Sequence, residues 1–76
     1  MADDGLAIWT VYDHPRDFPN TFVARKHIAR ASGTEATDDI VVSPDLTALR
    51  EVLALKGLTC ITRHPDDEPQ IVESWL

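Results

Sequence analysis

The chain has 76 residues, so it forms one domain close to the smallest size that folds unaided, because only about 60% of the unfolded surface is buried at this length. Its hydrophobic fraction of 43% and charged fraction of 26% are typical of globular proteins and indicate a folded body. Seven Lys and Arg residues against 13 Asp and Glu residues give a net charge of −6. That charge disfavours nucleic acids and anionic membranes as partners.

Cys60 is the single cysteine, so no disulfide can form within the chain and nothing marks an oxidising compartment. We interpret it as a small buried thiol, because free cysteines are among the most buried residues. The sequence has neither a signal-peptide pattern nor an apolar run of the ~18 residues that a membrane span requires. We therefore expect a cytoplasmic protein that does not insert into membranes.

The first half of the chain predicts strands separated by loops. Residues 1–5 are short and polar, and we expect them to be frayed. Ala7–Tyr12 is rich in β-branched and aromatic residues, and Thr21–Arg30 alternates between apolar and polar residues, so each segment predicts a strand. Residues 31–38 lack large apolar side chains and contain Gly33, which predicts a mobile surface loop.

The second half contains the clearest helix signal. Ile40–Ser43 predicts a short central strand, after which Ser43 offers an N-cap hydroxyl and Pro44 suits the first helical position. An apolar stripe with helical spacing follows, and Gly57 predicts the end of the helix. The stripe consists of Leu46, Leu49, Val52 and Leu53.

Leu58–Arg63 and Gln70–Leu76 predict two further strands around a turn at 64–69. The predicted fold is therefore a two-layer α+β domain in the order β-β-β-α-β-β. Its mainly antiparallel sheet of about five strands carries one amphipathic helix on one face. A helix is only ~10 Å wide, whereas five strands spaced ~4.8 Å apart span more than that width, so one helix cannot cover one face of the sheet and leaves the other face bare.

Two loops share the pattern H-P-x-D-x-P, at residues 14–19 and 64–69. Proline and aspartate favour stiff turns, which is a purely structural explanation. Simple topology, however, puts both loops and the helix N-terminus at one edge of the sheet. Imidazole and carboxylate ligands suit Zn²⁺ or similar ions, so a metal or small-anion site is the functional alternative. Its predicted residues are His14, Asp17, His64 and Asp67.

Four residues on the strands form a second candidate site, the partner-binding face Trp9, Arg25, His27 and Trp75. If they share the open face, they make an aromatic and cationic platform for planar or anionic groups. The alternative is that Trp9 and Trp75 belong to the core beneath the helix.

The segment Trp9–Pro19, followed by Phe22–Arg25, resembles small uncharacterised bacterial proteins with a W-T-V-Y-x-x-P-x-D-x-P type N-terminal segment. The resemblance implies a small stand-alone bacterial domain in the cytosol. It implies no particular activity, and no site residue follows from it.

The chain contains none of the short motifs of nucleotide-binding or hydrolytic enzymes, so we predict no catalytic residue and no cofactor other than the metal of the alternative. A bare sheet face favours a non-catalytic interaction module that forms a homodimer or binds a protein partner. The alternative is a metal- or small-anion-binding protein or enzyme that uses the two H-P-x-D-x-P loops.

Overall fold

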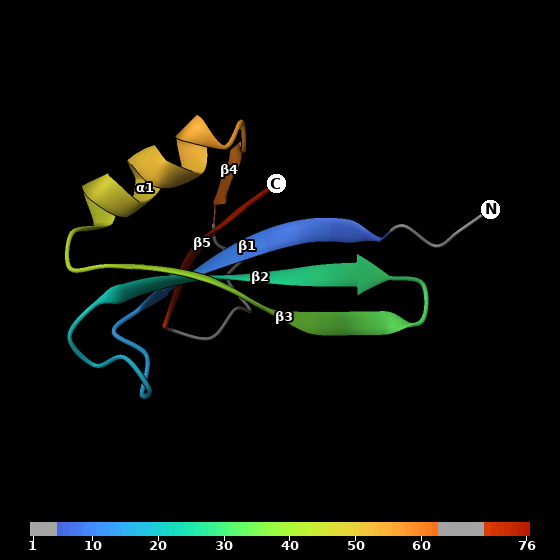
Figure 1. The fold of residues 1–76 in the computed structure, drawn as a ribbon, viewed down its shortest axis with the longest axis horizontal. Coiled ribbons are helices and arrows are strands. Elements are labelled where there is room, and N and C mark those ends of the chain that lie inside the picture. Colours follow the sequence, from blue (N-terminus) through green and yellow to red (C-terminus); the bar gives the residue numbers. More distant parts are fainter. Residues whose placement is uncertain (1–4, 63–69) are drawn as a thin grey trace.

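The computed structural model of the protein describes residues 5–62 and 70–76. Five strands form an antiparallel sheet in the order β3-β2-β1-β5-β4, and one helix packs on it (Figure 1). The elements are β1 (Leu6–Asp13), β2 (Phe22–Arg30), β3 (Gly33–Ser43), α1 (Leu46–Leu55), β4 (Cys60–Thr62) and β5 (Ile71–Trp75). The predicted two-layer α+β fold is confirmed. No helix in the described part of the chain is long and apolar enough to cross a membrane.

Several connections lie at one end of the sheet. The β1–β2 loop begins there after Asp13, whose backbone N–H donates to the carbonyl of Gln70 just before β5 (2.7 Å). Ser43 ends β3 beside Phe22, so α1 also begins at this end. The first H-P-x-D-x-P loop and the helix N-terminus therefore lie at the same end of the strands, as predicted. The second loop, at 64–69, lies outside the described residues.

The opposite end of the sheet extends beyond the helix. β2 and β3 form a long hairpin that projects away from α1 (Figure 1), and the molecule measures 41 × 26 × 24 Å along its principal axes. Arg30 pairs with Gly33 across the two-residue turn of this hairpin. One helix of 10 residues thus leaves the hairpin end of the sheet uncovered (Figure 1).

The core lies between α1 and the sheet face beneath it. Trp9 and Trp75 are directly opposite each other on β1 and β5, and both are buried. They confirm the alternative that places the two indoles in the core. The other buried members of this cluster are Val11, Ala24, Leu49 and Leu53. From the predicted helical stripe, Leu49 and Leu53 are fully buried, whereas Val52 is exposed.

The helix begins two residues later than predicted. Asp45, not Ser43, is the N-cap, and its carboxylate accepts a hydrogen bond from the backbone N–H of Thr47 (3.0 Å). Ser43 instead ends β3 as the register partner of Phe22, and its Oγ accepts from the N–H of Asp45 (3.1 Å). Aspartate caps helices as well as serine does, so the sequence offered two equivalent positions. Gly57, with a φ of 82°, follows the C-cap Lys56, as predicted.

The predicted loop at 31–38 is wrong, because the edge strand β3 begins at Gly33. An edge strand solvated on both faces needs no large apolar side chain, so the absence of such residues did not indicate a loop. The prediction of a buried central strand at Ile40–Ser43 is also wrong. Ile40 and Val42 lie on the same edge strand and are exposed.

Candidate functional site

The four residues of the predicted partner-binding face do not share a face. Trp9 is the register partner of Lys26, so Arg25 and His27 alternate onto the opposite side of β2. Trp9 and Trp75 retain only 8% and 7% of their surface beneath the helix. The open face, defined here as the sheet face away from α1, therefore carries Arg25 and His27 without the two indoles.

The first H-P-x-D-x-P loop folds over part of the open face. Arg25 forms an ion pair with Asp17, and its guanidinium lies 5.8 Å from the centre of the Phe18 ring. Val23, which alternates onto the same face as Arg25, is completely buried. This loop therefore covers one end of the open face, whereas the helix covers part of the opposite face.

The contacts of this loop do not favour the predicted metal site. His14 Nδ1 contacts the carboxylate of its neighbour Asp13, and the His14 ring packs edge-on against Phe22, with 4.9 Å between ring centres. Asp17 is engaged by Arg25 instead. His64 and Asp67, the other two predicted ligands, lie outside the described residues. Within residues 5–62 and 70–76, no three His, Cys, Asp or Glu side chains gather to hold a metal ion.

A hollow of about 350 Å³ opens beside the middle of β2. It arises where β3 bulges, because Arg25 pairs with Ile40 but His27 pairs with Ala36, which leaves residues 37–39 opposite one residue of β2. The lining consists of Tyr12, Arg25, Lys26, His27, Thr34, Ala36 and Thr37. Six of these seven residues carry a polar or cationic group, beside apolar parts of the same side chains and Ala36.

Thr37 holds the bulge in place. Its hydroxyl donates to the backbone carbonyl of Lys26 (2.8 Å) and accepts from the N–H of Asp39 (3.2 Å). In the described part of the chain, by contrast, the Tyr12 hydroxyl and the His27 ring make no hydrogen bond. The hollow therefore combines a fixed backbone with polar groups that are available to a ligand.

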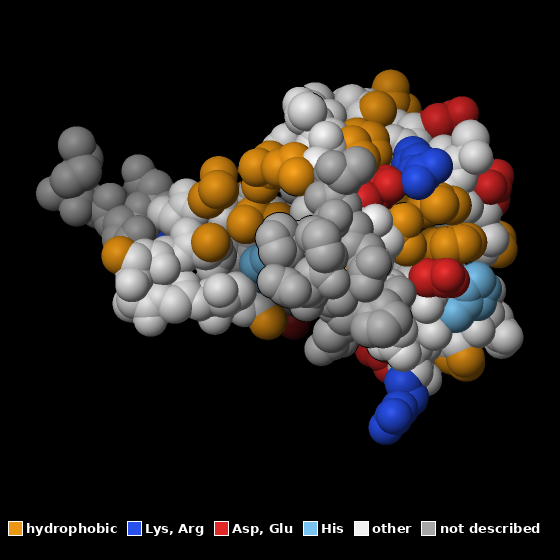
Figure 2. Space-filling model, turned by 180° about the vertical axis from the view of Figure 1, so that it is seen from behind, with side chains coloured by type: hydrophobic (Ala, Val, Ile, Leu, Met, Phe, Trp, Pro, Cys, Tyr) orange, Lys and Arg blue, Asp and Glu red, His pale blue; other side chains and the backbone are white. Residues whose placement is uncertain are grey.

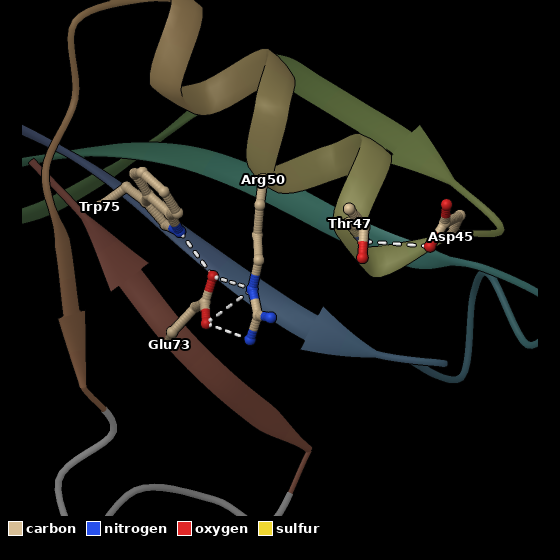
Figure 3. A network of polar contacts seen from close by, with 5 residues as sticks. All are labelled: Asp45, Thr47, Arg50, Glu73 and Trp75. Atoms are coloured by element: carbon tan, nitrogen blue, oxygen red, sulfur yellow. Dashed lines mark hydrogen bonds and ion pairs between the residues drawn. The ribbon is translucent and has the colours of Figure 1, made fainter.

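A second polar cluster lies on the helix side of the sheet, around Glu73 of β5 (Figure 3). Arg50 of α1 donates from Nε (3.0 Å and 3.2 Å) and from Nη2 (2.8 Å) to this carboxylate, and Trp75 Nε1 donates to it at 2.8 Å. Glu73 retains only 5% of its surface. Both carboxylate oxygens thus have donors, as a buried charge requires.

The environment of Glu73 fixes its charge. Burial alone would raise the pKa of Glu73, but the hydrogen bonds from Arg50 and Trp75 and the charge of Arg50 outweigh burial and lower it. The hydrogen bond to Glu73 in turn raises the pKa of Arg50. A carboxylate that is ionised and saturated with donors is a poor general base. The pair ties the helix to β5 and is a structural element.

Cys60 is exposed rather than buried as predicted, because it lies on the edge strand β4. Local burial of the thiol and the neighbouring charge of Glu73 nevertheless raise its pKa. Thiolates are the nucleophilic form, so this environment disfavours a catalytic role for Cys60.

Sequence reasoning missed the Glu73 cluster, although one signal was present. Glu73 and Trp75 are two residues apart on one strand, so they share a face. A charged residue on the face of a buried tryptophan requires a partner of opposite charge, and Arg50 on the only predicted helix was a candidate.

A scan against protein-family models and searches of curated proteins and of solved structures found no match to the chain.

Proposed function

We propose that the chain is a non-catalytic cytoplasmic interaction module that self-associates through the open face of its sheet, with another protein as the alternative partner. The observation that carries this proposal is the exposure of four large apolar side chains, which alternate onto the face away from α1. They are Leu6 (53% exposed), Ile40 (42%), Val42 (46%) and Ile61 (43%). Apolar groups exposed in this number on a small soluble domain favour a covered state.

The four side chains are spread across the sheet. Ile40 and Val42 lie on β3 at one edge, Ile61 lies on β4 at the other, and Leu6 begins β1. Seen from behind, hydrophobic side chains reach the surface at both ends of the molecule (Figure 2). A partner that covers all four would span the full width of the sheet, and a second copy of the chain has that width.

The edge of β3 adds backbone groups to this surface. β3 is the outer strand, so its far side has no neighbouring strand within the described residues. Charged side chains on an edge strand oppose unwanted pairing, and Asp38 and Asp39 lie in the bulge. The apolar stretch beyond them, Ile40–Ser43, is the part of the edge best suited to contact.

The experiment compares two lysine variants by size-exclusion chromatography with light scattering over a range of concentrations. Val42→Lys puts a charge on the open face, and we expect it to weaken self-association at least tenfold. Leu55→Lys is the matched control, because Leu55 is 88% exposed on the helix and lies outside the open face. A wild-type chain that stays monomeric at its highest soluble concentration contradicts self-association, and so does an equal effect of both variants.

A further inference from the structure

We propose that the hollow beside β2 binds a small anion through a phosphate group. Its volume of about 350 Å³ lies within the ~300–1,000 Å³ that small-molecule sites occupy. The proposal concerns a ligand site and does not depend on self-association.

The shape of the hollow is built into the backbone. The bulge at 37–39 separates β3 locally from β2, and the two hydrogen bonds of Thr37 hold this geometry. A site that exists before its ligand arrives loses little conformational entropy on binding. The hollow meets this condition.

The donors that face an entering anion come from both strands next to β2 and from β2 itself. Arg25 supplies a guanidinium with five N–H groups, and its ion pair with Asp17 uses Nη2. Tyr12 on β1 and Thr34 on β3 supply hydroxyls, and His27 supplies a ring nitrogen. These are the groups that bind oxyanions in proteins.

The half-buried position of the cation strengthens such contacts. The Arg25 side chain is 37% exposed and packs on the Phe18 ring, so it is partly shielded from water and held in one orientation. Charge-assisted hydrogen bonds gain strength in such surroundings. Phe18 and Asp17 thus hold the Arg25 guanidinium in one orientation.

The existing ion pairs select the kind of anion. Asp17 already neutralises Arg25, and Asp39 Oδ2 lies 3.6 Å from Lys26 Nζ. The chain also has a net charge of −6, which repels anions in general. A carboxylate would gain little by replacing one of these acids. A phosphate group carries a charge of about −1.5 to −2 and has three acceptor oxygens, so it competes better.

The test is an NMR titration of the ¹⁵N-labelled chain with inorganic phosphate, at constant ionic strength set with sodium chloride. We expect saturable amide shifts confined to the lining residues, including His27, Thr34 and Ala36. Sodium acetate is the comparison, and we expect it to bind more weakly. Shifts that never saturate, or that sodium chloride reproduces, would overturn the proposal.

Variants locate the site. Arg25→Gln should weaken phosphate binding about tenfold, because it removes a charge-assisted contact. Arg16→Gln is the matched control, since it removes the same charge from an exposed loop residue outside the hollow. Equal affinities of the two variants would mean that phosphate senses only overall charge and would refute the site.

Tyr12→Phe is a second variant, which tests the site even if Arg25→Gln disturbs the structure of the loop. It keeps the ring and removes only the hydroxyl, so the fold is retained while a donor is lost. We expect weaker phosphate binding with unchanged shifts on the helix side. Unaltered binding in both Tyr12→Phe and Arg25→Gln would rule the hollow out as the site, and the proposed self-association would be unaffected by that result.

Discussion

The two faces of the sheet differ in how their polar groups are used. On the helix side, the carboxylate of Glu73 has a donor for each oxygen, and Leu49 and Leu53 of α1 are fully buried. On the open face, Ile40 and Val42 are exposed, and His27 lies in a hollow without a hydrogen bond in the described part of the chain. The helix side therefore holds most of the buried core, whereas the open face keeps apolar and polar groups exposed.

The largest expected effect is on the stability of the helix side. Leu53→Ala should lower the free energy of unfolding by about 2–5 kcal/mol, because it opens a cavity beneath the helix. Leu55→Ala removes the same atoms from the same helix at an 88% exposed position. It should change the free energy of unfolding by only about a few tenths of a kcal/mol. Urea denaturation measures both. Similar losses for the two variants would show that the core is not where the structure has it.

The Arg50–Glu73 pair provides a second test of the difference between the two faces. Glu73→Gln should cost about 2 kcal/mol of unfolding free energy, because it leaves the Arg50 guanidinium without its carboxylate. Glu35→Gln is the control, since Glu35 pairs with Arg30 (3.1 Å) at the surface, where such pairs are worth about 0–1 kcal/mol. If Glu35→Gln destabilised the chain as much as Glu73→Gln, the Arg50 pair would have no special role.

The same carboxylate predicts a pH dependence. The pKa of Glu73 in the folded chain lies below its ordinary 4.5, so the folded state holds the ionised form more strongly than the unfolded state does. Its contribution to stability is therefore full above pH 4.5 and is lost as the pH falls through the folded pKa. Urea denaturation of the wild type and of Glu73→Gln should show a difference that shrinks on acidification. A difference that grows at low pH would contradict this sign.

Much of the fold was predictable from local signals. Five strands and one helix follow from alternation, helical spacing and the glycine after the helix, and Trp9 and Trp75 were recognised as alternative core residues. The edge strand β3 was missed at residues 33–38, because an edge strand can be polar on both faces. Residues 33–36 pair with β2 across the two-residue turn after Arg30, but the polar composition of residues 33–38 contains no apolar alternation that would indicate a strand.

The sites were less predictable, because they depend on which faces meet. Alternation predicted that Arg25 and His27 share a side, but the side taken by Trp9 depends on register and on where the helix packs. The hollow depends on a bulge that no residue type specifies. The Arg50–Glu73 pair joins two elements, and the only sequence signal for it was the position of Glu73, two residues before Trp75 on the same strand.

A smaller effect is expected at the start of the helix. Asp45→Ala should lower the unfolding free energy by about 1 kcal/mol, because the N–H of Thr47 loses its acceptor. Ser43→Ala should cost less, since Ser43 ends β3 and is not the N-cap. Thermal unfolding of the two variants measures the order. A larger loss of unfolding free energy for Ser43→Ala would mean that Ser43 is the N-cap, as the sequence predicts.

The smallest effect concerns the chemistry of Cys60, an exposed residue on the edge strand β4. Local burial of the thiol and the charge of Glu73 raise its pKa, so it should react with iodoacetamide more slowly at pH 8 than it does in urea-unfolded protein. Glu73→Gln removes the charge and should shift the pH profile of alkylation to lower pH. Faster opening of a destabilised chain would instead multiply the rate at every pH, so the shape of the profile separates the two causes. An unshifted profile would mean that the carboxylate, although fixed by Arg50, does not reach the thiol at the sheet edge.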